Sequence, residues 1–255
     1  SNFELTICQQ PEDKFLSNEG VINEGEIATR LGVIGIPRIA EKIGLDRDIN
    51  ICRDVDAKYH AMNISTKEAI ETIAAAKKSK LKISASTTPH HLMLTEEEAL
   101  SYRTFAKTSP PLRTKDDNEI LKKSLKNGSI DFVSSNNSPR SEDQKRVSLS
   151  AAEFGVIGLE TLFPAVNTAF GNSAKLNEIF KFLSLNTAKF MGLENRGEIK
   201  KGYIADLILL DINKDNLINP ENFKGKAVNS PFDGITLKGK VLRTYVSGNL
   251  VYNEN

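Results

Sequence analysis

The chain has 255 residues, of which 39% are hydrophobic, so it can bury a core and is not disordered throughout. Its 34 Lys and Arg residues nearly balance its 33 Asp and Glu residues, which argues against a protein that binds nucleic acid through bulk charge. Two cysteines cannot form a disulfide framework or a four-thiolate zinc site, and only three histidines are present to bind a metal.

Strand-like and helix-like segments alternate along the first part of the chain. Apolar or alternating runs predict strands over residues 3–8, 59–64, 81–87 and 130–134. Helices are predicted over residues 24–31, 36–55, 65–78, 114–125, 158–170 and 174–185. Ser65 and Glu68 have the spacing of a capping box at the start of one of these helices. Strands separated by helices of about 10–15 residues indicate right-handed crossovers and a parallel sheet.

The pattern changes near residue 195. Residues 205–211 and 240–246 are rich in strand-forming side chains, and Gly248-Asn249 fits a two-residue hairpin turn before residues 250–252. We therefore expect a βα region over residues 1–194 and a small β region over residues 195–255.

Targeting signals are not evident in the sequence. No segment reaches the roughly 18 apolar residues that cross a bilayer, and the N-terminus has no basic stretch followed by an apolar one. These features predict a reduced, cytoplasmic setting. The chain opens in a strand-like segment, which suggests that something precedes it.

Three histidines and one arginine are candidates for a catalytic or binding role. His90 and His91 follow a predicted strand, where the active-site loops of βα barrels lie. Adjacent histidines cannot easily bind one metal from a strand end, so we favour a loop packed by imidazole hydrogen bonds. His60 lies inside a strand, which favours a hydrogen-bonded core histidine. Arg113 ends the rigid turn Ser109-Pro-Pro-Leu-Arg113 and suits a structural ion pair or a ligand contact equally well.

Seven stretches, in order from about Gln10 to the C-terminus, resemble the bacterial type I dihydroorotases. They are Val21-Ile-Asn-Glu-Gly-Glu26, Gly35-Ile-Pro37, Thr88-Pro-His-His-Leu92, Pro110-Pro-Leu-Arg113, Phe154-Gly-Val-Ile-Gly-Leu-Glu160, Gly202-Tyr-Ile-Ala-Asp206 and Asn229-Ser-Pro-Phe-Asp-Gly234. The resemblance implies an α/β fold, the C-terminal part of a metal-bearing (β/α)8 TIM-type amidohydrolase barrel, with strands five to eight and a small β subdomain. It also implies pyrimidine biosynthesis, where the family interconverts carbamoyl aspartate and dihydroorotate. A half barrel has open strand edges, so we expect it to need a partner or the other half.

The residues at the family's metal positions differ from the family pattern. By the resemblance, the ligands of strands five, six and eight fall on Gln10, Asn63 and Asn136, where the family carries His, His and Asp. Ser109 and Arg140 replace an Asn and a His at substrate positions. Neutral amides are weak zinc ligands and bring no charge to offset a dication. Without a metal no water is activated for attack on the ring amide.

We therefore expect a dihydroorotase-like protein without catalytic residues or a bound cofactor. The resemblance implies that it serves as a non-catalytic subunit with aspartate carbamoyltransferase. A homo-oligomer stays an open alternative, and neither nucleic acid nor a membrane is expected as a partner.

Two other hypotheses remain open. One is an active dihydroorotase, or a related cyclic amidohydrolase, in which Glu12, Asp13 or His60 builds an altered zinc site. The other is a small-molecule binding module, in which the old pocket recognises a pyrimidine or an amino acid. Its candidate pocket residues are His90, Ser109, Arg113, Asn137 and Arg140.

Overall fold

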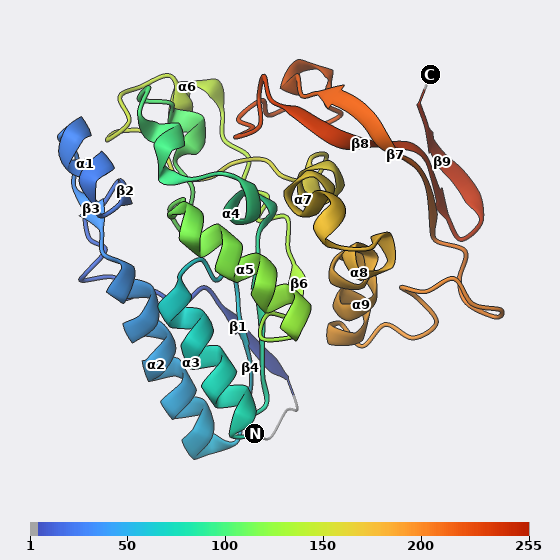
Figure 1. Cartoon of the computed structure of the whole chain (residues 1–255), viewed down its shortest axis with the longest axis horizontal. Helices are drawn as coiled ribbons and strands as arrows, with labels where there is room; N and C mark the ends of the chain where they lie inside the picture. Colours follow the sequence, from blue (N-terminus) through green and yellow to red (C-terminus); the bar gives the residue numbers. More distant parts are fainter. Residues whose placement is uncertain (1–4, 255) are drawn as a thin grey trace.

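Four parallel strands form the central sheet of the protein, a computed structural model of which describes residues 5–254. The sheet order is β1-β4-β5-β6, with β1 (Thr6–Gln9), β4 (Lys58–Ala61), β5 (Ile83–Thr87) and β6 (Phe132–Val133) (Figure 1). All three pairings are parallel, which confirms the predicted parallel sheet. Phe3 and Glu4, with which the first predicted strand begins, lie outside the described residues.

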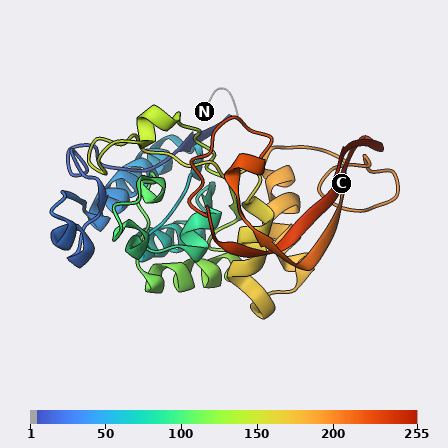
Figure 2. The same ribbon diagram turned by 90° about the horizontal axis from the view of Figure 1, so that it is seen from above.

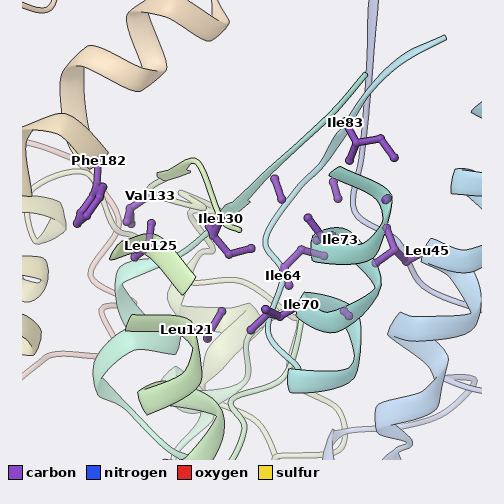
Figure 3. Packing of buried hydrophobic residues seen from close by; sticks show 14 of the residues in the cluster. Leu45, Ile64, Ile70, Ile73, Ile83, Leu121, Leu125, Ile130, Val133 and Phe182 are labelled. Atoms are coloured by element: carbon purple, nitrogen blue, oxygen red, sulfur yellow. The ribbon is translucent and has the colours of Figure 1, made fainter. Parts of the chain in front are cut away.

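Three long helices, α2 (Arg38–Val55), α3 (Lys67–Lys78) and α5 (Lys115–Asn127), lie side by side along the sheet (Figure 1). In α3 the buried residues recur every three or four positions, as they do in a helix with one apolar face. Figure 3 shows the resulting core, in which side chains of the three helices meet those of the sheet and its loops. Its labelled members include Leu45, Ile64, Ile70, Ile73, Leu121 and Ile130.

Shorter elements connect and cover this core. No helix in the described part of the chain is long and apolar enough to cross a membrane. The remaining elements before residue 195 are β2 (Ile22–Asn23), α1 (Glu26–Leu31), β3 (Gly35–Ile36), α4 (Pro89–Met93), η1 (Glu96–Ala99), η2 (Thr104–Ala106), α6 (Glu142–Lys145), α7 (Leu162–Phe170), η3 (Gly171–Ser173), α8 (Leu176–Phe180), η4 (Lys181–Leu185) and α9 (Asn186–Phe190).

An antiparallel sheet follows residue 195. It consists of β7 (Leu207–Leu217), β8 (Thr236–Val246) and β9 (Asn249–Asn253), with η5 (Pro220–Asn222) between the first two strands. Seen from above, this sheet lies to one side of the parallel sheet and its helices (Figure 2). Ser247 and Gly248 form the β8–β9 turn with φ of 50° and 81°, so the predicted Gly248-Asn249 turn is wrong by one residue.

The predicted capping box at the start of α3 is also wrong. Thr66 is the N-cap, and its Oγ1 accepts a hydrogen bond from the backbone N–H of Ala69 at 3.3 Å. The hydroxyl of Ser65 donates instead to the buried carboxylate of Glu41. Glu68 pairs with Arg38 at 2.7 Å rather than with the helix start. The buried carboxylate of Glu41 needs hydrogen-bond donors, and Ser65 supplies one of them. The hydroxyl of Ser65 is therefore engaged with Glu41, and Thr66 caps the helix.

Candidate functional site

Three amide side chains meet at the carboxyl end of the parallel sheet. Gln10 follows β1, Asn63 follows β4 and Asn136 follows β6. Parallel strands present their carboxyl ends at one edge, and in barrel enzymes the active site lies there. Asn63 and Asn136 have φ of 57° and 46°, in the left-handed region that asparagine tolerates better than most residues. The structure therefore brings together the three positions that the family resemblance singled out.

Asn63 is the centre of a hydrogen-bond network among these amides. Its Nδ2 donates both hydrogens, one to Oε1 of Gln10 and one to Oδ1 of Asn136, each at 3.1 Å. Its Oδ1 accepts from the hydroxyl of Ser134 at 3.0 Å. A side-chain amide has two donor hydrogens, so the donor capacity of Asn63 is fully used.

Ser109 closes this network into a ring. Nε2 of Gln10 donates to Oγ of Ser109 at 2.8 Å, and Nδ2 of Asn136 donates to the backbone oxygen of Ser109 at 3.0 Å. We call Gln10, Asn63, Asn136 and Ser109 the amide ring. It links the ends of three strands to the loop before α5 without using any charged group.

The amide ring does not fit a catalytic zinc ion. Zinc is held by thiolates, imidazoles and carboxylates, and the ring supplies none of them. The side-chain oxygens of Gln10 and Asn136 both accept a hydrogen from Asn63, so an NH2 group lies where two oxygen ligands converge. Nowhere in residues 5–254 do three His, Cys, Asp or Glu side chains gather as a metal site would require. Glu12, Asp13 and His60, from which an altered zinc site was one hypothesis, therefore do not form such a group.

His60 lies within the sheet as a neutral, hydrogen-bonded histidine. Its ring nitrogens share hydrogen bonds with the hydroxyls of Ser84 at 2.8 Å and Ser86 at 3.1 Å, and the ring stacks on Phe132. Burial lowers the pKa of His60 to about 4. The prediction of a core histidine is confirmed.

His90 and His91 are both buried in α4. His91 shares hydrogen bonds with Thr88 at 2.7 Å and with the backbone oxygen of Pro111 at 3.0 Å, and burial lowers its pKa to about 4. His90 is fully buried, its pKa is lowered by burial, and neither ring nitrogen has a hydrogen-bond partner within the described chain. His91 fits the predicted loop packing by imidazole hydrogen bonds, whereas His90 packs without them.

Arg113 is a buried structural cation. Its Nε donates to Oγ of Ser65 at 3.0 Å, its Nη1 donates to Oδ1 of Asn23 at 2.6 Å, and its Nη2 lies 3.8 Å from a carboxylate oxygen of Glu41. Burial lowers the pKa of Arg113, and Glu41 opposes this shift. The sequence pointed to Arg113 but not to its partners Glu41 and Asn23, because they lie 72 and 90 residues earlier in the chain and no local pattern links them to Arg113.

Asn137 and Arg140 lie beyond the amide ring. Oδ1 of Asn137 accepts the backbone N–H of Gly158 at 3.1 Å, and Nε of Arg140 donates to the backbone oxygen of Phe154 at 2.7 Å. Arg140 lines a separate cavity of about 220 Å³ together with Asn229. Of the five predicted pocket residues, only Ser109 belongs to the amide ring.

A family profile provides the first comparison with known proteins. The profile described as the amidohydrolase family matches residues 25–251. The chain belongs to the amidohydrolase family.

Curated relatives refine this assignment. The chain is 40% identical to a dihydroorotase of Thermoanaerobacter sp. (strain X514), over 99% of the chain and 59% of that protein. It is 39% identical to a dihydroorotase of Ehrlichia canis and 35% identical to one of Bacillus pumilus, covering 57% and 60% of their lengths. The resemblance to the dihydroorotases is thereby confirmed. The chain spans about three fifths of the length of these relatives.

Solved structures confirm the fold. The L-hydantoinase of Arthrobacter aurescens superposes with a TM-score of 0.87 at 23% identity, over 99% of this chain and 58% of that one. A dihydropyrimidinase from Brevibacillus agri superposes with a TM-score of 0.83. The parallel sheet with its helices is therefore part of an amidohydrolase barrel, as the sequence predicted.

Proposed function

We propose that this amidohydrolase-family chain is a dihydroorotase-like protein of pyrimidine biosynthesis that does not carry out metal-dependent hydrolysis. The single observation that carries the proposal is the position of the Asn63 amide. Its NH2 group donates to both Gln10 and Asn136, so these three positions satisfy one another instead of binding a cation.

The described residues also lack a suitable base at this place. Opening a cyclic amide needs an activated water and a group that takes its proton. Asn136 stands where the family resemblance implies an aspartate, and an amide does not accept a proton at neutral pH. His60 and His91 are buried with pKa values of about 4, and their hydrogen bonds go to other groups.

The test is an assay of dihydroorotate hydrolysis, and of the reverse cyclisation of carbamoyl aspartate, by the chain supplied with excess zinc. The proposal predicts no turnover above the buffer control. Turnover that is lost in the variant Asn63→Ala, while the exposed variant Asn177→Ala keeps it, would favour the alternative of an active hydrolase with an altered site.

The proposed role is that of a non-catalytic subunit with aspartate carbamoyltransferase. The support is the resemblance to a family in which inactive members associate with that enzyme. Buried contacts such as the Arg113–Glu41 pair hold the scaffold while the positions of the family's metal ligands carry amides, and this combination supports a structural role.

Co-expression with aspartate carbamoyltransferase, followed by light scattering, tests this role. We expect a stable complex and a change in transcarbamoylase assembly or activity. A chain that neither binds the transcarbamoylase nor alters its activity would contradict the subunit role and favour a ligand-binding module.

A further inference from the structure

The cavity beside Arg140 lies between two parts of the chain. Arg140 and Lys145 line it from the segment that follows β6, whereas Glu221 and Asp233 line it from the connection between β7 and β8. Ligand sites are frequent where two such parts of a protein meet. The volume of about 220 Å³ is below the range of about 300–1,000 Å³ that drug-sized ligands need, so the cavity suits a small molecule.

The guanidinium of Arg140 offers free donors to this cavity. Its Nε donates to the backbone oxygen of Phe154 at 2.7 Å, and its backbone N–H donates to Oδ1 of Asn229 at 3.2 Å. Asn229 is itself buried and donates to the backbone oxygens of Ser138 and Gly155. Among the described residues neither Nη group of Arg140 has a hydrogen-bond partner or an ion pair. Two such groups side by side can bind both oxygens of a carboxylate.

The other two cations of the cavity wall already have partners. Lys145 is buried, and its ammonium donates to backbone oxygens, of which the nearest is that of Glu153 at 2.6 Å. Arg146 pairs with Glu142 at 2.9 Å. Arg140 is therefore the cation of this wall that is open to a ligand.

Two carboxylates lie at the outer part of the same cavity. Glu221 and Asp233 are exposed, whereas Arg140 is half-buried. Neither carboxylate has a hydrogen bond or an ion pair with another described residue. A simple anion would meet these carboxylates, and a simple cation would meet the guanidinium. A molecule with one charge of each sign meets an opposite charge at both of its ends.

We propose that this cavity binds a small amino acid. The carboxylate of the ligand accepts hydrogen bonds from the two Nη groups of Arg140, and its ammonium lies at Glu221 and Asp233. Phe105 and Val228 supply apolar wall for the carbon chain between the two charges. The cavity is separate from the amide ring, so the proposal does not depend on the proposed loss of hydrolysis.

Isothermal titration calorimetry of the chain with each of the protein amino acids tests the proposal. We expect at least one of them to bind with a Kd below about 1 mM. The analogues of that amino acid that lack the amino group or the carboxyl group are titrated next. Each analogue is expected to bind at least about tenfold more weakly, because one of its ends no longer meets an opposite charge.

Two variants separate the two ends of the cavity. Arg140→Gln removes the cation, and Glu221→Gln/Asp233→Asn removes both carboxylates without changing their size. We expect each to weaken binding by at least about tenfold. The controls Arg30→Gln and Asp54→Asn change the same kinds of charge at exposed positions outside the cavity and are expected to bind normally. Circular dichroism establishes that each variant is folded.

Three results would overturn the proposal. The first is that no amino acid binds with measurable affinity. The second is that the cavity variants bind as tightly as the two controls. The third is that the analogue without an amino group binds as tightly as the amino acid, because the site would then recognise a simple carboxylate.

Discussion

Asn63 donates a hydrogen bond to Asn136 across 3.1 Å, from the end of β4 to the end of β6, past the intervening strand β5. By the family resemblance, these two positions correspond to metal ligands that the dihydroorotases carry on different strands. Here the same positions hold each other directly. The contact joins the two strand ends through uncharged side chains.

Removing the central amide will destabilise the fold. The variant Asn63→Ala deprives Gln10, Asn136 and Ser134 of a hydrogen-bond partner each, at a buried position. We expect a loss of about 1–3 kcal/mol in the free energy of unfolding, measured by urea denaturation. Asn177→Ala, at an exposed position, is the control and is expected to change stability by less than about 0.5 kcal/mol. Equal effects of the two variants would contradict the network.

The buried pair Arg113 and Glu41 will behave as a coupled unit. Arg113→Met leaves the Glu41 carboxylate buried without its cation, and we expect a loss of about 3–5 kcal/mol. Glu41→Gln removes the charge but keeps acceptor and donor groups, so the double variant is expected to lose much less than the sum of the two single losses. Urea denaturation of the four proteins measures the coupling. Strictly additive losses would show that the two residues act independently.

Stability will fall as the solution becomes acidic. Burial lowers the pKa of His60 and of His91 from 6.5 to about 4, so each stays neutral in the folded protein while its unfolded counterpart takes up a proton. Between pH 6.5 and about 4 the unfolded state binds more protons, and each histidine costs up to about 3 kcal/mol over that range. Denaturation at several pH values tests this. His60→Gln is expected to flatten the slope, and an unchanged slope in that variant would refute the assignment to His60.

Restoring one ligand will not restore hydrolysis. Groups of a metal site act together, so Gln10→His, Asn63→His or Asn136→Asp alone supplies one donor to a site that still lacks the others. We expect no dihydroorotate hydrolysis from any single variant. The triple variant is expected to gain zinc affinity over the single variants, measured by calorimetric titration. A single variant with substantial hydrolysis would mean that the remaining ligands are already present.

Much of the fold follows from the sequence because local patterns decide it. The alternation of strands with helices of about 10–15 residues predicted the parallel sheet, and Gln10, Asn63 and Asn136 were found through the motifs of the family resemblance and their order. The cap of α3 was missed because Ser65 donates to Glu41, which lies 24 residues earlier in the chain. No local pattern contains such a contact.

The candidate pocket was harder to predict than the fold. From the sequence, Arg113 suited a structural ion pair and a ligand contact equally well. In the structure it is buried, hydrogen-bonded to Asn23 and paired with Glu41. Arg140 instead faces a separate cavity, because its Nε is held by the backbone of Phe154. Where a polar side chain ends up depends on distant partners, which one sequence does not reveal.

Zinc binding tests most directly the claim that the amide ring replaces a metal centre. The measurement is the zinc content of the chain by elemental analysis after purification without chelator, repeated for Asn63→Ala and for the exposed control Asn177→Ala. We expect no stoichiometric zinc in any of the three proteins. About one or two zinc ions per chain, retained in the control and lost in Asn63→Ala, would contradict the account.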